Sequence, residues 1–500
     1  MYEYLVQAIS LVAEPCTLLT ILVASIYGLF VGAIPGLTAT MAAALLVPFT
    51  FFMEPLPAMA AIVAMEAMAI FAGDIPATLV RMPGTPSSAA YTDDCYALTK
   101  QGKAGQVLGV GVTCSAIGGL LGALSLMVAA PLLAECAMSF TSFEYFWLAV
   151  LGLSSAVVVS SGSMVKGAIA LMLGLLISTV GIDITLGYPR FTFGNVELTG
   201  GINFIPAMIG LFGVSEVLRN VLHSEELQVA TSEAPRHIFS GIATVVRRYK
   251  MGILRSSIIG VVIGILPGAG ADIAAWIAYA VTKNASPEAD KFGQGHIEPI
   301  VGATSANNAA LGGAWVPALV FGIPGDSITA ILIGVLMMKG LRPGPMIFEQ
   351  QPVLLYAVYV TFILANILLI PLGYLAIRSS GMLLRVSKNY LLPIILLFSI
   401  VGSFAINNSL FDVGVMLVMG LLGFYLEANG VPVAPVVLGI VLGPIVEQNF
   451  MISVIKTHWS LWEFFTRPVS AVLCLGALLM WGYPLFSYFR KRKSSLSASG

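Results

Sequence analysis

The chain has 500 residues, of which 58% are hydrophobic and only 10% are charged. Its 24 Lys and Arg nearly balance its 25 Asp and Glu, and the net charge of −1 excludes a chain-wide attraction for nucleic acid. With a mean hydropathy of +0.94, the composition predicts an all-α, polytopic protein of the lipid bilayer.

Apolar runs predict the membrane segments in chain order. In the first half they fall near residues 17–34, 38–53, 57–72, 105–130, 143–160, 163–182 and 203–222. In the second half they fall near residues 251–266, 270–282, 313–338, 352–377, 391–407, 410–427, 432–447 and 468–489. Several runs are too short, or too interrupted by Gly and Pro, to cross about 30 Å of hydrocarbon as one straight helix. We therefore expect broken helices and re-entrant hairpins, whose freed backbone groups face protein or water.

Short patterns repeat on the two sides of a polar interval near the middle of the chain. Gly28-x3-Gly32-x2-Pro35-Gly36 recurs as Gly260-x3-Gly264-x2-Pro267-Gly268, and Leu79-Val80-x2-Pro83-Gly84 recurs as Leu319-Val320-x3-Pro324-Gly325. Landmarks that recur in the same order predict an internal duplication. The expected parts are a first membrane repeat over residues 1–222, a polar linker over 223–250, a second repeat over 251–465, and a final helix with a basic tail over 466–500.

Basic residues flank the two halves differently. The first half opens with Glu3 and Glu14 and no basic residue, whereas the second opens after Arg247, Arg248 and Lys250. Cytoplasmic loops collect Lys and Arg, so equivalent segments are expected to start on opposite sides of the membrane. This charge pattern predicts two inverted-topology repeats.

The densest polar stretch of the first half, residues 73–94, contains a Pro-Gly pair that is expected to end one helix. The threonine after it is a good N-cap, and the serines that follow would offer free amides and hydroxyls. Such a helix N-terminus suits a carboxylate, while a surface loop with an ordinary cap is the alternative. The expected solute contacts in this stretch are Pro83, Gly84, Thr85, Ser87 and Ser88.

Three further Pro-Gly elements interrupt apolar runs at residues 35–38, 267–272 and 324–327. Each ends one run and opens another, which the tip of a helical hairpin within the membrane requires. The element at 324–327 is the counterpart of the polar stretch in the first half. The solute contacts expected from these elements are Gly36, Thr38, Gly268, Pro324, Gly325, Asp326 and Ser327.

A second polar stretch, residues 302–313, is rich in hydroxyl and amide side chains although it lies between apolar segments. Uncharged oxygens of this kind suit Na⁺ better than a transition metal, and helix packing is the alternative. Aspartates near the helix breaks are functional candidates, with a water-exposed loop as the alternative that we favour for Asp93 and Asp94. The expected cation ligands are Asp74, Asp272, Ser305, Asn307 and Asn308.

The two polar stretches, GDIPATLVRMPGTPSSAAYTDD and GATSANNAALGG, resemble the large membrane subunit of the tripartite tricarboxylate transporter family, and the likeness extends over about residues 15–465. The resemblance implies a bacterial inner-membrane complex with a small membrane subunit and a periplasmic solute-binding protein. It implies cation-coupled uptake, with Na⁺ or H⁺, of a di- or tricarboxylate such as citrate, without a cofactor. It leaves a homodimer open.

An intramembrane enzyme and a passive anion channel are the competing hypotheses. The sequence contains no H-E-x-x-H, G-x-S-x-G or G-x-x-x-x-G-K-[ST] pattern, so a metalloprotease, a serine hydrolase and an ATP-driven pump lack their motifs. A channel would need a pore ring or a selectivity filter supplied by an oligomer. Saturable, cation-dependent uptake distinguishes a carrier from a channel.

Reporter fusions test the expected orientation of the two halves. Fusions after Leu222 and after Phe489 are expected to report the cytoplasm, because clusters of basic residues follow both points. A fusion at Glu14 is expected to report the opposite side. A cytoplasmic signal at Glu14 would remove the charge argument for inverted repeats and leave the duplication intact.

Overall fold

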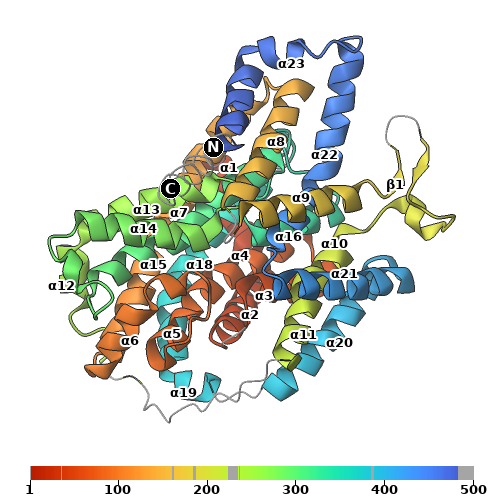
Figure 1. Ribbon diagram of the computed structural model, residues 1–500. Helices are drawn as coiled ribbons and strands as arrows, with labels where there is room; N and C mark the ends of the chain where they lie inside the picture. Colours follow the sequence, from red (N-terminus) through yellow and green to blue (C-terminus); the bar gives the residue numbers. More distant parts are fainter. Residues whose placement is uncertain are drawn as a thin grey trace, which may run out of the picture. The chain divides into compact units, whose positions relative to one another are not determined.

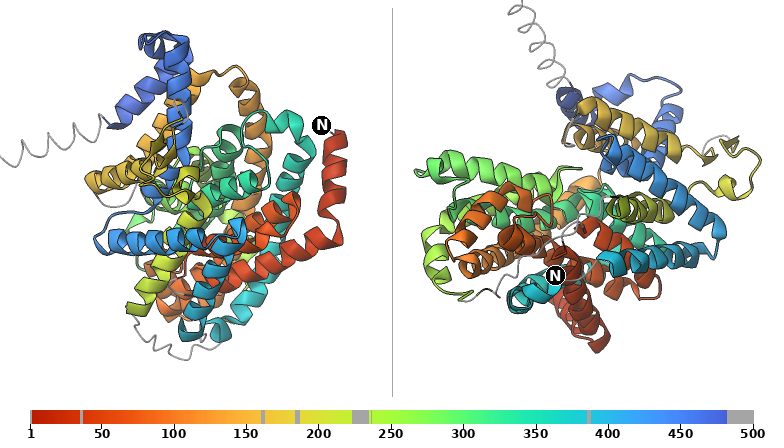
Figure 2. Two further views of the ribbon diagram at one scale, coloured as in Figure 1. Left: turned by 90° about the vertical axis from the view of Figure 1, so that its right-hand side faces the viewer. Right: turned by 60° about the horizontal axis from the view of Figure 1, so that its bottom comes forward.

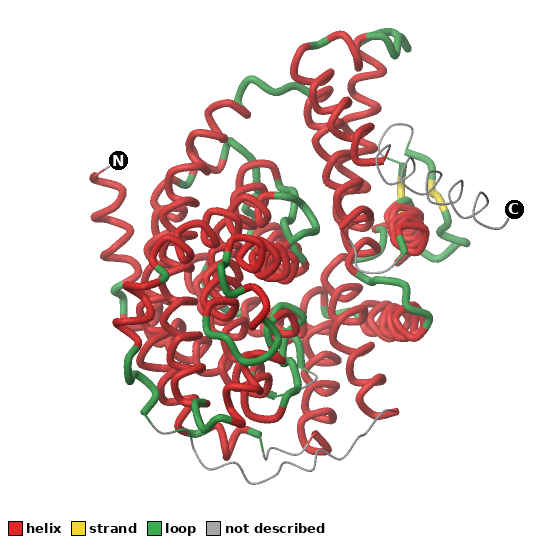
Figure 3. The backbone as a smooth tube through the Cα atoms, turned by 60° about the vertical axis from the view of Figure 1, so that its left-hand side comes forward, coloured by secondary structure: helices red, strands yellow, loops and turns green. Residues whose placement is uncertain are grey.

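The computed structural model describes residues 2–34, 37–159, 163–183, 187–222, 235, 237–384 and 388–481. Helices make up 79% of the described residues (Figure 3). In the described ranges the strands are one short antiparallel pair, β1 (Gly181–Ile182) and β2 (Pro189–Arg190). The prediction of an all-α, polytopic membrane protein is confirmed.

Helix lengths separate into two classes. Among the described residues, seven helices are long and apolar enough to cross a membrane: Pro15–Gly32, Pro55–Val80, Ala104–Ala137, Phe204–Leu222, Pro352–Arg378, Leu410–Ala428 and Ala434–Lys456. Apolar helices of 10–17 residues accompany them: Glu3–Val12, Ala39–Phe51, Ser142–Val158, Met164–Ser178, Ser327–Met338, Leu391–Asn407 and Pro468–Trp481. The shorter helices follow the interruptions by Gly and Pro that the sequence contains.

The chain forms two compact units, one made of Met1–Glu135 with Ile205–Tyr425 and the other of Cys136–Phe204 with Leu426–Gly500. The first unit, in chain order, contains α1 (Tyr2–Val12), α2 (Pro15–Gly32), α3 (Ala39–Phe51), α4 (Pro55–Ala72), α5 (Asp74–Val80), η1 (Ser88–Ala90), α6 (Thr92–Lys100), most of α7 (Ala104–Ala137), α10 (Phe204–Met208), the π-helical turn η3 (Ile209–Val214) and α11 (Ser215–Leu222). It continues with α12 (Ile242–Arg248), α13 (Lys250–Ile265), α14 (Gly270–Ala285), η4 (Ala289–Lys291), α15 (Glu298–Phe321), α16 (Ser327–Met338), α17 (Ile347–Gln350), α18 (Pro352–Arg378), α19 (Ser380–Leu383), α20 (Lys388–Asn407) and α21 (Leu410–Ala428). The repeats expected from the sequence are defined by duplicated patterns, whereas these units are defined by packing. The repeat boundaries therefore stay a prediction.

The second unit is built around α22 (Ala434–Lys456), on which α8 (Ser142–Val159) and α9 (Met164–Ser178) pack. It also contains η2 (Glu197–Gly200), α23 (Glu463–Thr466) and the helix Pro468–Trp481. Arg190 on β2 binds Glu447 on α22 at 2.5 Å. This ion pair ties the strand pair to the central helix of the unit.

Glycines bring α2 close to α4 in the first unit. A Cβ atom placed on Gly28 would lie 2.4 Å from the carbonyl oxygen of Met65, and one placed on Gly32 would lie 2.3 Å from that of Ala69. Both distances are far below van der Waals contact, so only glycine permits this approach. Before this pair, α1 and α2 meet at an elbow at residues 13–14, which is visible in red in Figure 2.

The same contacts recur between α13 and α15. A Cβ atom on Gly260 or on Gly264 would lie 2.2 Å from the carbonyl oxygen of Ala306 or of Ala310, respectively. These two alanines stand 241 positions after the residues that α2 contacts on α4. α13 and α14 lie side by side in Figure 1 and form the second hairpin. The shared spacing supports the internal duplication, while the inverted orientation of the two halves stays a prediction.

Gly264→Ala is expected to lower the melting temperature of the purified protein. Its methyl group would meet the backbone of Ala310 at 2.2 Å, and overpacking of this kind costs about 1–3 kcal/mol. Gly252 on the same helix has no atom within 4 Å of an added Cβ, so Gly252→Ala is the matched control and should melt at or slightly above the parental temperature. Equal melting temperatures for the two variants would contradict the close packing of α13 on α15.

Candidate functional site

Helix breaks occur in the polar stretch 73–94 and at the Pro-Gly element 324–327. Gly73 separates α4 from α5, and α5 ends at Val80, just before Arg81, whose φ of 58° is left-handed. In the second half α15 ends before Gly322, whose φ of 68° is also left-handed, and the chain restarts as α16 at Ser327. The Pro-Gly pairs lie inside these breaks, as the sequence predicts.

The two hairpin tips adopt the interrupted form expected from their Pro-Gly pairs. Between α2 and α3, Thr38 is the N-cap of α3 and its hydroxyl accepts the N–H of Met41 at 3.2 Å. Gly36, an expected solute contact at this tip, lies outside the described residues. Between α13 and α14, Gly268 has a φ of 80°, which favours glycine and turns the chain back.

Within each half, the backbone of the Pro-Gly pair contacts the backbone of the hairpin tip or of the broken helix directly. The N–H of Gly84 donates to the carbonyl of Gly73 at 3.2 Å, and a Cβ atom on Gly84 would lie 2.9 Å from the carbonyl oxygen of Gly32. The N–H of Gly268 donates to the carbonyl of Gly325 at 2.8 Å. A valine at either Pro-Gly glycine would therefore strain the fold as well as the site, so such variants do not isolate solute binding.

Matching hydrogen bonds close the two breaks. Thr85 and Ser88 exchange bonds, the N–H of each donating to the hydroxyl of the other at 3.2 and 3.3 Å. Asp326 and Thr329, which stand 241 positions later, also exchange bonds. The N–H of Asp326 donates to the hydroxyl of Thr329 at 2.9 Å, and the N–H of Thr329 donates to the carboxylate of Asp326 at 2.8 Å. Asp326 therefore caps the twelve-residue α16 in a capping box.

The helix expected to follow Thr85 is a single turn of 3₁₀ helix, and this expectation is corrected. η1 covers three residues, and the next α-helix begins only at Thr92. The hydroxyl of Ser88 donates to the carbonyl of Thr85 at 2.8 Å, and the hydroxyl of Thr92 donates to that of Ser88 at 2.8 Å. Side-chain bonds of this kind compete with regular helix formation.

Predicted site residues from both halves form one chain of polar contacts. The hydroxyl of Tyr91 donates to Asp74 at 2.5 Å and lies beside the side chain of Asn307. The Nδ2 atom of Asn307 donates to the hydroxyl of Ser87 at 3.0 Å. The backbone N–H of Ser87 donates to Asp272 at 3.1 Å. This series of polar contacts joins α5, the Pro-Gly break, α15 and α14.

The amides expected to receive a solute are bonded within the protein. The amide of Ser87 donates to Asp272, that of Ser88 to Thr85, and that of Thr329 to Asp326. The positive end of a helix attracts the nearest carboxylate, and here that carboxylate belongs to the chain itself. The contribution of these residues to solute binding stays a prediction.

The three polar residues expected on α15 differ in their contacts. Asn308 donates to the carbonyl of Ala67 at 3.3 Å, and within the described part of the chain the Oδ1 atoms of both Asn307 and Asn308 have no hydrogen-bond partner. Both asparagines are 1% exposed. Ser305 instead faces α7, where a Cβ atom on Gly118 would lie 2.1 Å from its carbonyl oxygen. These contacts favour a ligand role for the asparagines and a packing role for Ser305.

Glu66 also lies within this region, although the sequence analysis did not select it. It is the lone charged residue in the apolar α4, its side chain is 0% exposed, and the indole N–H of Trp315 donates to it at 2.9 Å. The signal that identifies it is its position, because a charged side chain within an apolar span is a functional candidate by default.

Buried carboxylates outnumber buried bases in the first unit. No Lys, Arg or His side chain is buried among the residues that the structure describes. An anionic solute in this region would therefore meet negative charge without a basic side chain to offset it. The buried carboxylates of the unit include Glu66, Asp74, Asp94, Glu216 and Asp412.

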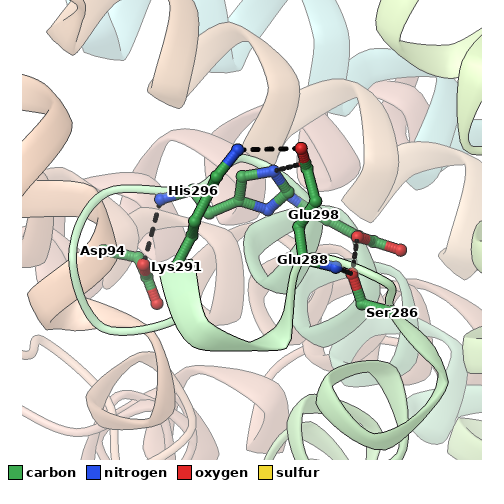
Figure 4. Close-up of polar contacts among 6 residues, drawn as sticks. All are labelled: Asp94, Ser286, Glu288, Lys291, His296 and Glu298. Atoms are coloured by element: carbon green, nitrogen blue, oxygen red, sulfur yellow. Dashed lines mark hydrogen bonds and ion pairs between the residues drawn. The ribbon is translucent and has the colours of Figure 1, made fainter.

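Asp94 is buried, which corrects its expected place in a water-exposed loop. It is 1% exposed, and it accepts the backbone N–H groups of Gly293, Gly295 and His296 at 2.9–3.1 Å. These donors lie in the loop between α14 and α15, shown in Figure 4, so the contact fixes a second-half loop on a first-half helix. Asp93 is exposed, as expected.

The same loop carries a small set of ion pairs (Figure 4). Glu288 binds Lys291 at 2.8 Å and His296 at 2.8 Å. The hydrogen bonds from Lys291 and His296 hold the pKa of Glu288 below its ordinary value. Ser286 donates to Glu298 at 2.6 Å and closes the loop at the start of α15.

Broken helices that meet at buried polar groups are typical of membrane transporters. Residues 18–438 match the tripartite tricarboxylate transporter TctA family, and the chain belongs to this family. It is therefore a large transporter subunit with several membrane-spanning helices, and it is not an enzyme.

Two proteins of Agrobacterium vitis are similar to this chain. An uncharacterized 52.8 kDa protein in the TAR-I ttuC' 3' region is 35% identical over 459 residues, which are 92% of this chain and 91% of that protein. An uncharacterized protein in the TAR-II ttuC' 3' region is 36% identical over 214 residues, which are 43% of this chain and 88% of that protein. No solved structure matches the chain.

Proposed function

We propose that the chain is the permease subunit of a binding-protein-dependent secondary transporter in the bacterial inner membrane. The transporter takes up a di- or tricarboxylate such as citrate together with Na⁺ or H⁺. The family consists of large subunits of tripartite transporters, which supports a small membrane subunit and a periplasmic solute-binding protein as partners.

The observation that carries this proposal is the polar chain from Asp74 to Asp272, which contains carboxylates, amides and hydroxyls but no basic side chain. Like charges in a low-dielectric interior repel strongly, so a carboxylate solute cannot enter this chain alone. A cation bound at the same time offsets the charge. Coupling between solute and cation follows from this charge balance.

The asparagines on α15 are the best placed ligands for that cation. Their Oδ1 atoms are buried and have no protein donor in the described part of the chain. An amide oxygen is a neutral ligand that suits Na⁺, and unwound backbone near a helix break supplies further carbonyl oxygens. The solute would lie next to them, against the hydroxyls of Thr85 and Ser87.

The matched contacts of the two halves fit an alternating-access cycle. If the halves are inverted, as their flanking charges predict, rocking one half against the other would expose the polar chain to each side in turn. A passive anion channel lacks such a cycle and would leave both sides connected.

Uptake by the reconstituted complex tests the proposal. Proteoliposomes that contain the chain and its two partner subunits should accumulate labelled citrate, or a dicarboxylate, against its gradient when a Na⁺ or proton gradient is imposed. The flux should saturate with solute. Non-saturable flux that only runs downhill would contradict the proposal and favour the channel.

Asn307→Ala and Asn308→Ala should each raise the Na⁺ concentration needed for half-maximal uptake, because each removes one buried oxygen ligand. Losing one ligand should cost about as much binding free energy as losing one hydrogen bond, about 1 kcal/mol, which corresponds to a several-fold rise in the cation concentration for half-maximal uptake. The solute concentration for half-maximal uptake should change less. Asn449→Ala in the second unit is the control, since Asn449 donates to the carbonyl of Ile445 in its own helix. Unchanged cation dependence in well-expressed variants would assign both asparagines to helix packing.

A further inference from the structure

Glu66 has one donor and one unpartnered oxygen in a fully buried position. Its Oε2 atom accepts the indole N–H of Trp315 at 2.9 Å, and its Oε1 atom has no hydrogen-bond partner among the described residues. Every other residue of α4 from Ala58 onward is apolar. The carboxyl group therefore has one hydrogen-bond donor among the described residues, and its own helix supplies no other.

The helices packed against α4 supply no positive charge to Glu66. They are α2, α3, α5, α15, α16 and α18, and their basic residues lie only at their ends. Arg81, after α5, binds Asp93. Lys339, after α16, donates to two backbone carbonyls, and Arg378, at the end of α18, lies over the ring of Tyr374.

The charged group that acts on Glu66 is Asp326, which has the same sign. An ionised Glu66 would thus be desolvated, unpaired and repelled, which is an unfavourable combination. The other titratable groups on the packed helices are Cys16, Tyr27, Asp74, Glu298, Tyr356, Tyr359 and Tyr374.

A proton fits this position better than a metal cation. Hard metal cations take about six oxygen ligands, whereas Glu66 offers one free oxygen and its own helix adds no other polar side chain from Ala58 onward. A proton needs only that oxygen. Because Trp315 already occupies Oε2, the proton belongs on Oε1.

The duplication adds an independent argument. Glu66 stands 241 positions before Asn307, the spacing that also separates Gly84 from Gly325. The equivalent position of the second half therefore holds a carboxamide, which has the shape of a protonated carboxyl but never ionises. At this shared position α4 has a titratable carboxyl group and α15 has none.

We propose that Glu66 is a proton-binding site whose Oε1 atom gains and loses one proton in each transport cycle. The proton bonds to the carboxylate when the site faces the outside, and the O–H bond breaks when the proton leaves to the cytoplasm. The ionised form is then unfavourable in the buried arrangement and has to be protonated again before the next uptake. This role rests on the proposed transport function and makes H⁺ a coupling ion beside any Na⁺ at the asparagines.

Glu66→Gln tests the proposal because the carboxamide still accepts the Trp315 N–H but cannot exchange a proton. In proteoliposomes with the partner subunits, the variant should retain exchange of labelled citrate across the membrane. Its proton-driven net uptake should fall at least tenfold and should lose its pH dependence. A folded Glu66→Gln variant with the parental net uptake and pH profile would overturn the proposal.

Glu216→Gln is the matched control. Glu216 is also buried in the first unit, but Arg219 and Asn220 both donate to its carboxylate. Removing its charge should leave the pH profile of uptake parental. A parental complex that exchanges no carboxylate at all would instead contradict the proposed transport function.

Infrared spectroscopy of the purified protein gives a readout that does not depend on transport. At pH 7 the difference spectrum between the parental protein and Glu66→Gln should contain the carbonyl band of a protonated carboxyl. Trp315→Phe, which keeps Glu66 and removes its donor, should shift that band. If Glu66→Gln does not fold, the comparison between the parental and Trp315→Phe spectra tests the proposal, because the acid carbonyl band should be present in both and shifted in the variant. Carboxylate bands from Glu66 in place of the acid band would overturn the proposal.

Discussion

Charge balance at the meeting point of the broken helices is the constraint on which the rest of the first unit depends. Asp74, Asp272, Asp326 and Glu66 lie in this region; Asp74 and Glu66 are buried, Asp326 is half-buried and Asp272 is exposed. No buried basic side chain accompanies them in the described residues. Buried charge is tolerated only when it is paired, hydrogen-bonded or neutralised. Hydroxyls and amides supply part of that compensation, and in the function proposed above protons and a bound cation supply the rest.

Close backbone packing makes this arrangement possible. Glycines on α2 and α13 let each hairpin approach the broken helix beside it at distances that no other residue permits. The approach brings the hairpin tip of each half to its Pro-Gly break. The short side chain of Asp272 then reaches the backbone N–H of Ser87 across the two halves.

The sequence predicted the features that depend on local rules, and it missed those that depend on tertiary contacts. The breaks at Pro83-Gly84 and at Pro324-Gly325 follow from Gly and Pro patterns, and Asn307 is a candidate because an amide between apolar segments is unusual. The bond from Ser87 to Asp272 joins residues 185 positions apart, and no local pattern indicates it. The polar sequence around Asp94 suggests a water-exposed loop. The structure buries Asp94 under a distant loop, which donates three backbone N–H groups to its carboxylate.

The most direct test of the account is equilibrium binding of labelled citrate, or of a dicarboxylate that the complex transports, at varied Na⁺ concentration and pH. A site without buried basic residues should bind the anionic solute more tightly as Na⁺ or H⁺ rises. By linkage, the solute should raise the affinity for the cation by the same factor. A solute affinity that stays constant across Na⁺ concentration and pH would contradict the account.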